Sequence, residues 1–149
     1  MAQVPDSIER SVEIDASAER VWGLVSEPGW WINGGAALRE HRIEEQDGLV
    51  LVHDEEHGVF RIRVVALERP RRAVFVWIPS SGDEALGSTS GTTVEFTITP
   101  RDGGVVLTVV ESGFRALALP EERLRRNYDD NQEGWAVEME LARAVVEQR

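Results

Sequence analysis

Residues 121–146 read EERLRRNYDDNQEGWAVEMELARAVV, and this stretch decides the fold. Its apolar side chains recur at steps of three and four residues, which is the spacing of one face of an α-helix. They are Leu124, Tyr128, Trp135, Met139, Ala142 and Val146, with Leu141 and Val145 widening the stripe. The pattern predicts one long amphipathic helix at the C-terminus. Gly134 inside it is costly for a helix and indicates close packing against a sheet.

The chain before this helix is dominated by segments in which apolar and polar residues alternate, as they do in strands. Strands are predicted at residues 8–14, 38–44, 49–53, 59–67, 73–78, 92–99 and 105–112. Two short helices follow the first strand: one over residues 21–25, behind the cap residues Asp15 and Ser17, and a helical turn at Trp30-Trp31. No helices separate the later strands, so parallel crossovers are excluded. The order predicts an α+β domain with a curved antiparallel sheet of about six or seven strands.

Length and composition narrow the class of protein further. The chain has 149 residues, which suits a single domain over residues 1–149. It contains no cysteine, which excludes disulfides, thiolate catalysis and Cys-ligated zinc and suits a reducing cytoplasm. The formal net charge of −11 repels phosphate backbones and anionic lipid. We therefore expect a cytoplasmic protein that binds neither nucleic acid nor membrane.

Several local motifs resemble those of one known family. They are residues 14–22 (IDASAERVW), residues 68–77 (ERPRRAVFVW), residues 111–114 (ESGF) and the helix motif Asn131-x-x-Gly134-Trp135. In order and spacing they resemble the START-like (SRPBCC, Bet v 1-like) superfamily. Within it, the chain is similar to stand-alone bacterial members of the heat-shock-protein-90 ATPase activator C-terminal-domain family. It departs from the pattern at Asn131, where many relatives carry His, and at Ala142, where a larger aliphatic residue is usual.

The resemblance implies a helix-grip fold, in which the sheet wraps the long C-terminal helix and an apolar cavity lies between them. Relatives bind lipids, hormones or polyketides, and a minority are enzymes. The resemblance implies no common catalytic set, no cofactor and no metal for this chain. It leaves a chaperone partner open, and it is compatible with a monomer or a homodimer.

Strand alternation and helix spacing predict which side chains line this cavity. Phe75 and Trp77 share one face of their strand, as do Leu107, Val109 and Glu111 of theirs. The predicted ligand-binding residues are Trp30, Phe75, Trp77, Phe96, Leu107, Val109, Glu111, Tyr128, Asn131, Trp135 and Met139. For Tyr128 and Trp135 the alternative is a purely structural core position, and for Asn131 a local backbone hydrogen bond.

Glu111 is the polar member of this set. If Leu107 and Val109 point inward, Glu111 does too, and its carboxylate could orient a polar group of a ligand. Alternatively, it reaches solvent at the strand end or pairs with an arginine, for which Arg61 and Arg63 are candidates.

Two further motifs are open to more than one interpretation. A helix cannot bury the adjacent Trp30 and Trp31 on one face, so one of them is expected at the cavity entrance. His53 and His57 have the spacing of a metal-binding helix, but the flanking residues alternate as strands do. The pair is therefore predicted at a hairpin tip without metal-ligand geometry.

Three functions fit these features. The first is a non-enzymatic binding protein for a small hydrophobic or amphipathic molecule. The second is a co-chaperone-like module that acts on a heat-shock ATPase. The third is a cyclase or hydrolase that uses Glu111 or a pocket histidine as acid or base, although no paired titratable groups converge in the sequence.

Overall fold

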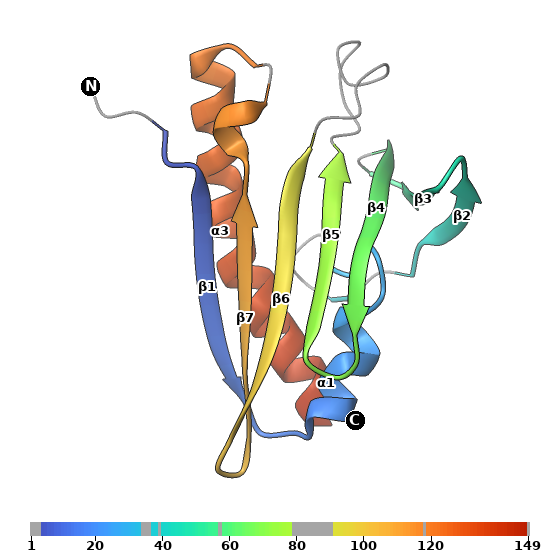
Figure 1. Cartoon of the computed structure of the whole chain (residues 1–149), viewed down its shortest axis with the longest axis vertical. Helices are drawn as coiled ribbons and strands as arrows, with labels where there is room; N and C mark the ends of the chain where they lie inside the picture. The colour runs from blue at the N-terminus through green and yellow to red at the C-terminus, as the bar shows by residue number, and fades with distance from the viewer. Residues whose placement is uncertain are drawn as a thin grey trace.

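The computed structural model describes residues 4–33, 37–38, 40–56, 58–78, 91–117 and 119–148. Its seven strands form one antiparallel sheet in the order β1-β7-β6-β5-β4-β3-β2 (Figure 1). The strands are β1 (Ser7–Ile14), β2 (Arg42–Gln46), β3 (Leu49–Asp54), β4 (Gly58–Glu68), β5 (Arg72–Ile78), β6 (Thr92–Arg101) and β7 (Gly104–Ser112). The predicted α+β class and antiparallel sheet are confirmed.

One predicted strand is displaced. The sequence placed a strand at residues 38–44, whereas β2 begins at Arg42 and ends at Gln46. All five of its residues are exposed, because β2 is an edge strand that pairs only with β3 among the described strands. Its alternation therefore carries little hydrophobic signal, and the Asp47-Gly48 turn, with positive φ at both residues, fixes its end instead.

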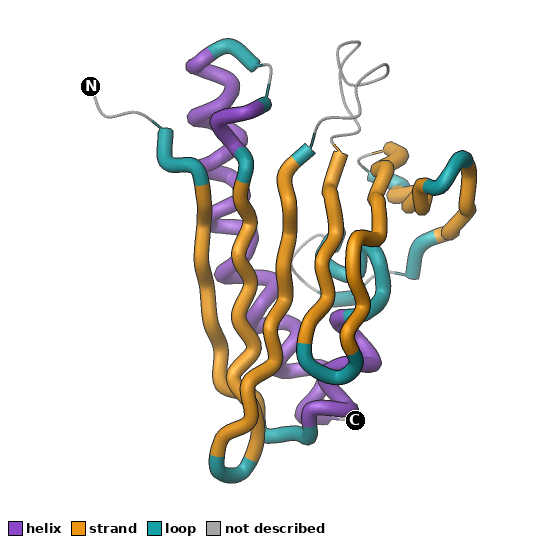
Figure 2. Tube along the Cα trace, viewed as in Figure 1, coloured by secondary structure: helices purple, strands orange, loops and turns teal. Residues whose placement is uncertain are grey.

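The long helix α3 (Glu121–Gln148) lies against one face of the sheet, as Figure 2 shows. Near its start, the Tyr128 hydroxyl donates to the Ser7 carbonyl oxygen of β1 at 3.0 Å. Near its end, the Glu147 carboxylate accepts from the Asp15 backbone N–H at 2.9 Å, and the Val146 carbonyl accepts from Arg20 at 2.8 Å. The helix is thus held to the N-terminal part of the chain at both ends.

The short helix α1 (Ala18–Val25) begins behind Ser17, whose hydroxyl accepts from the Arg20 backbone N–H at 3.2 Å. The predicted second short helix is instead a turn. The backbone N–H of Trp30 bonds the Glu27 carbonyl, and that of Ile32 bonds the Gly29 carbonyl. Gly29 has a positive φ of 81°, a conformation that glycine adopts without steric cost.

This turn buries both tryptophans, whereas the expected helix would place one of them at the cavity entrance. Trp30 is 5% exposed and Trp31 is 4% exposed. The one-face limit holds for a regular helix, where neighbours point about 100° apart. A turn lacks this constraint, so both rings enter the interior with an interplanar angle of 89°.

The expectation for Gly134 is also wrong. A Cβ added at Gly134 would meet nothing within 4 Å, so this position is not a close approach of α3 to the sheet. The close approaches lie elsewhere: at Gly104, for example, a Cβ would stand 2.1 Å from the Ile14 carbonyl oxygen.

Candidate functional site

The inner face of β7 carries a carboxylate into the apolar interior. Leu107, Val109 and Glu111 alternate along the strand, and each is 0% exposed. Their partners on β6, which include Phe96 opposite Val109, point to the same side. The predicted inward direction of Glu111 is therefore confirmed.

Glu111 is held by hydrogen bonds from two elements of the fold. From β6, the Thr92 hydroxyl donates to Oε2 at 2.5 Å. From α3, the Trp135 Nε1–H donates to Oε1 at 2.8 Å, and the Asn131 amide lies 3.1 Å from both oxygens. Asn131 and Trp135 are four residues apart, so they stand one above the other on the same side of the helix. A single carboxylate thus connects two strands with the long helix.

The electrostatic state of Glu111 follows from this setting. Burial raises the pKa of its carboxyl above the ordinary value of 4.5, because a charge is costly away from water. The hydrogen bonds from Thr92, Trp135 and Asn131 oppose this rise in pKa by stabilising the charged form. None of these three side chains is titratable, so no proton-exchange partner hydrogen-bonds Glu111 within the described structure. The candidates Arg61 and Arg63 lie on β4, which is separated from β7 by β5 and β6, so this prediction is wrong.

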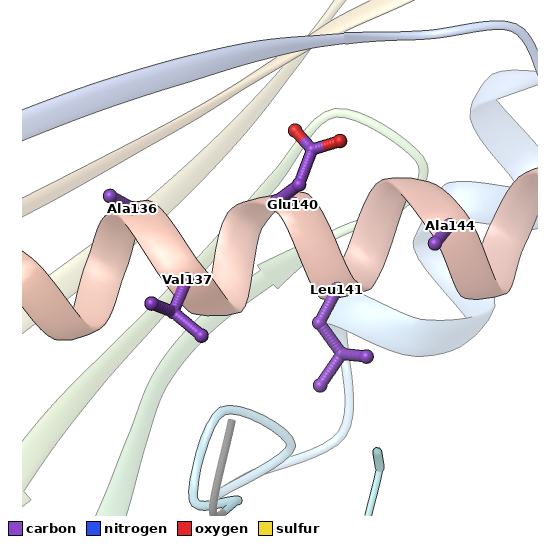
Figure 3. A pocket seen from close by; sticks show the side chains of 5 residues that line it. All are labelled: Ala136, Val137, Glu140, Leu141 and Ala144. Atoms are coloured by element: carbon purple, nitrogen blue, oxygen red, sulfur yellow. The ribbon is translucent and has the colours of Figure 1, made fainter. Parts of the chain in front are cut away.

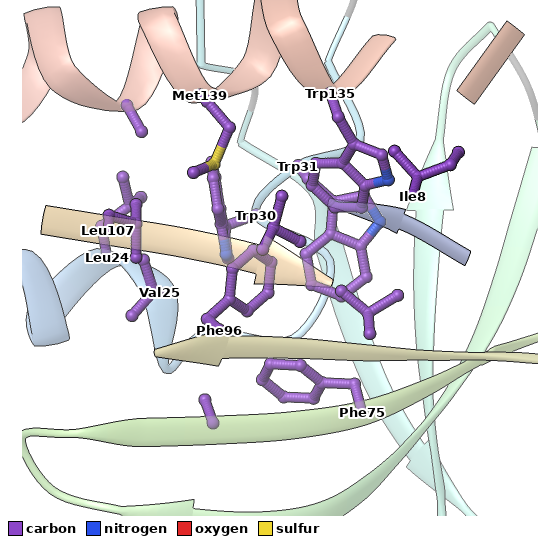
Figure 4. Packing of buried hydrophobic residues seen from close by; sticks show 14 of the residues in the cluster. Ile8, Leu24, Val25, Trp30, Trp31, Phe75, Phe96, Leu107, Trp135 and Met139 are labelled. Atoms are coloured by element: carbon purple, nitrogen blue, oxygen red, sulfur yellow. The ribbon is translucent and has the colours of Figure 1, made fainter. Parts of the chain in front are cut away.

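An aromatic cluster occupies the layer between α3 and the sheet (Figure 4). We use this name for Trp30, Trp31, Phe75, Trp77, Phe96 and Trp135. Figure 4 shows Trp135 and Met139 pointing from α3 toward the sheet, with Trp30 and Trp31 in the same layer. Ring centroids within the cluster are 5.2 to 6.3 Å apart, which is the separation of aromatic rings in contact. Five of the eleven predicted ligand-binding residues therefore meet in this cluster, while the predicted cavity itself stays a prediction.

The cluster contains buried polar atoms without partners. The Nε1 atoms of Trp30, Trp31 and Trp77 are buried and have no hydrogen-bond partner within the described structure. A buried donor without an acceptor costs about 1–3 kcal/mol. By contrast, the Nε1–H of Trp135 is satisfied by Glu111. Buried side-chain donors usually have a hydrogen-bond partner, so three unsatisfied donors in one cluster are unusual.

A second buried carboxylate was missed by the sequence interpretation. Glu138 of α3 is 7% exposed, and its Oε1 accepts from the Asn33 amide at 2.8 Å. The same amide donates to the Trp30 carbonyl oxygen at 2.7 Å. Glu138 follows Asn131 by seven residues and Trp135 by three, so helical spacing could have placed it beside them. The Asn33–Glu138 contact ties the tryptophan turn to α3.

Tyr128 lies outside the aromatic cluster. Its ring packs edge-on against Phe114 with centroids 5.1 Å apart, and its hydroxyl is taken by Ser7 of β1. The buried hydroxyl of Tyr128 is therefore satisfied within the protein. Its placement favours the structural interpretation of this residue over a role in ligand binding.

The predicted hairpin that contains His53 is confirmed, because β3 and β4 pair from Val50 opposite Ile62 to Asp54 opposite Gly58. His53 lies 2.7 Å from Glu44 of β2, while Asp54 is buried and 3.0 Å from His41. His57 lies outside the described residues. Within the described part of the chain, no group of three or more potential ligands has the geometry to hold a metal ion.

One hollow formed by described residues lies along α3, and none of its lining residues belongs to the aromatic cluster (Figure 3). It is lined by Ala136, Val137, Glu140, Leu141 and Ala144. Val137 is 46% exposed, so the hollow is an open apolar surface rather than an interior site. No described helix is both long and apolar enough to cross a membrane.

Together, these features define a helix-grip domain: a curved antiparallel sheet, a long helix across it, and a buried carboxylate with an aromatic cluster between them. The family model described as "Activator of Hsp90 ATPase homolog 1-like protein" matches residues 15–145. The chain belongs to this family. The resemblance inferred from the local motifs is thereby confirmed.

Solved structures support the same fold. The protein MLL2253 from Mesorhizobium loti is 22% identical with a TM-score of 0.71, over 95% of this chain and 97% of that one. The Aha1 dimer from Colwellia psychrerythraea is 12% identical with a TM-score of 0.66, over 95% and 96% of the two chains. DynU16, described as a putative protein in the dynemicin biosynthetic locus, is 20% identical with a TM-score of 0.67, over 96% of this chain and 48% of that one. At these identities the similarity shows the fold alone. A search of curated protein sequences finds no match.

Proposed function

We propose that this protein binds a small hydrophobic or amphipathic molecule between the sheet and α3, without catalysing a reaction. The fold commonly serves this purpose, and the described interior supplies both chemical parts of such a site. The aromatic cluster supplies apolar surface. Glu111, which is 0% exposed, supplies a polar end, and this buried carboxylate is the observation that carries the proposal.

The surroundings of Glu111 favour binding over catalysis. Both of its oxygens are already engaged by Thr92, Asn131 and Trp135. A general acid or base usually works with a second titratable group, and Thr92, Asn131 and Trp135 are not titratable. The groups that contact Glu111 can orient a ligand's polar atoms by exchanging hydrogen bonds, but none of them is an acid or base that titrates near neutral pH.

Native mass spectrometry of the purified chain, followed by a thermal-shift screen of fatty acids, fatty alcohols and planar aromatic compounds, tests the proposal. Saturation at a hundredfold excess over Kd stabilises the folded state by about 2.7 kcal/mol, which raises Tm by several degrees. In Glu111→Gln, ligands with a polar head should lose affinity by about tenfold, while the purely apolar ones should not. Absence of a retained molecule together with an unchanged Tm across the screen would overturn the proposal.

The family suggests a second candidate, a co-chaperone-like role. The open apolar hollow on α3, with Val137 46% exposed, is a surface on which a protein partner could act. The test is the ATPase rate of the host's own heat-shock chaperone with this chain and with Val137→Glu. No stimulation by saturating wild-type protein would exclude this role. Assembly as a monomer or homodimer stays a prediction, and size-exclusion chromatography with light scattering measures it.

A further inference from the structure

Trp31 has the central position in the aromatic cluster. Its ring centroid lies between 5.5 and 6.2 Å from the rings of Trp30, Phe75, Trp77, Phe96 and Trp135. These neighbours come from the turn, β5, β6 and α3, so Trp31 touches both layers that the fold brings together (Figure 4). It is only 4% exposed. The indole thus fills the centre of the layer between the sheet and α3, where the proposed function places the ligand.

The backbone that carries Trp31 differs from that of its neighbours. Phe75, Phe96 and Trp135 belong to strands or to α3, and they cannot leave without disrupting a hydrogen-bonded element. Trp31 belongs to a turn outside the helices and strands, and its described hydrogen bonds include those from the Asn33 amide to Trp30 and to Glu138. A turn of this kind can move while the sheet and α3 stay intact.

The aromatic cluster contains hydrogen-bond donors that are not satisfied. Trp31 and its neighbours Trp30 and Trp77 each bury an Nε1–H that has no acceptor in the described structure. An occupant with an acceptor oxygen would satisfy donors that Trp31, itself a donor, leaves unsatisfied.

We propose that Trp31 is an internal occupant of the ligand site, which the ligand displaces on binding. The inference rests on the proposed function and adds the chemical class of the ligand. Because an indole fits the position, the ligand contains a planar two-ring aromatic unit. Because the remaining indole donors lack acceptors, this unit carries a carbonyl or similar acceptor oxygen.

The test uses chromone, a planar two-ring molecule with a carbonyl acceptor, and naphthalene, which has the same two rings without it. Both are titrated into the full chain by calorimetry and by ¹⁵N–¹H spectra, where each of the five tryptophans gives one indole N–H signal. In the wild type, chromone should move the Trp31 signal to the position of a solvent-exposed indole. Naphthalene should bind more weakly than chromone, because it satisfies no donor.

Substitutions then separate displacement from simple binding. Trp31→Ala should bind chromone at least tenfold more tightly than the wild type, because nothing needs to be displaced, and it should also bind indole in competition with chromone. Trp22→Ala is the matched control: it removes an equally large buried ring, 7% exposed, from α1 outside the cluster and should leave chromone affinity unchanged. Asn33→Ala keeps every ring but loosens the turn, so it should raise chromone affinity even if Trp31→Ala fails to fold.

The outcomes distinguish this inference from the proposed function. In one outcome, the wild type binds small molecules, the Trp31 signal stays in place, and neither Trp31→Ala nor Asn33→Ala binds chromone more tightly. The proposal that Trp31 is an internal occupant is then overturned, and the binding function stands. If the wild type retains no molecule in the native mass-spectrometry screen and none of the variants binds chromone or indole, both are overturned.

Discussion

At Glu111, the hydrogen bond from Trp135 can be separated from the packing of its ring. Trp135→Phe keeps an aromatic ring at a position that is 2% exposed, but it removes the Nε1–H that donates to Glu111 and leaves a smaller ring. Hydrogen bonds to a charged or partly charged group contribute about 1.5–3 kcal/mol. We expect the free energy of unfolding of Trp135→Phe, measured by urea denaturation, to fall by about 2–4 kcal/mol when the smaller ring is included.

Trp77→Phe is the matched control for that substitution. Trp77 belongs to the same cluster, its ring centroid lies 6.3 Å from that of Trp135, and its Nε1–H has no described partner. Its replacement removes a buried donor that costs energy, so the loss of stability should be smaller than in Trp135→Phe by at least about 1 kcal/mol. Equal losses in the two variants would show that ring volume, rather than the bond to Glu111, sets the effect.

At the scale of elements, α3 contains a residue that lowers the stability of the helix although no close contact requires it. Gly134 lies in the middle of the helix, and an added Cβ would touch nothing within 4 Å. Alanine is favoured over glycine inside a helix by about 1 kcal/mol. Gly134→Ala should therefore raise the free energy of unfolding by about 0.5–1 kcal/mol, read from thermal and urea denaturation.

Gly104→Ala is the contrasting substitution, because its Cβ would lie 2.1 Å from the Ile14 carbonyl oxygen and force β1 and β7 apart. It should destabilise the protein. A decrease in stability for Gly134→Ala would mean that this glycine serves a contact or a motion that the folded structure does not show.

The same elements show what could be predicted from the sequence. The period of two in β7 predicted that Glu111 points inward, and the three- and four-residue steps in α3 predicted the apolar stripe with Trp135, one turn after Asn131. The hydrogen bonds from Asn131 and Trp135 to Glu111 depend on how α3 lies along the sheet, and no local period in the sequence encodes this. Trp30 and Trp31 were misjudged because turns have no repeating period, and their direction is set by single features such as the positive φ of Gly29. The edge strand β2 was misplaced because exposed strands carry little hydrophobic pattern.

At the scale of the whole molecule, Glu111 makes stability depend on pH. Burial raises the pKa of its carboxyl in the folded state, so the folded protein binds this proton more tightly than the unfolded chain does. The neutral carboxyl makes its full contribution to the free energy of unfolding when the pH is below its ordinary pKa of 4.5. This contribution is lost as the pH rises through the raised pKa of the folded state. Each tenfold difference in proton affinity corresponds to about 1.4 kcal/mol.

Glu111→Gln isolates this contribution from the many other carboxylates of a chain whose net charge is −11. Glutamine keeps the size of the side chain and an oxygen for the Trp135 Nε1–H, but it cannot ionise. The free energy of unfolding of the wild type minus that of Glu111→Gln should be constant below about pH 4.5, fall as the pH rises, and level off above the raised pKa. Urea denaturation of both proteins from pH 4 to 8 measures this difference, and Trp77→Phe, which changes no titratable group, should differ from the wild type by the same amount at every pH. If the Glu111→Gln curve also runs parallel to that of the wild type, the carboxylate takes up its proton as readily in the unfolded chain as in the folded one. The cost of burying its charge would then be fully offset by Thr92, Asn131 and Trp135.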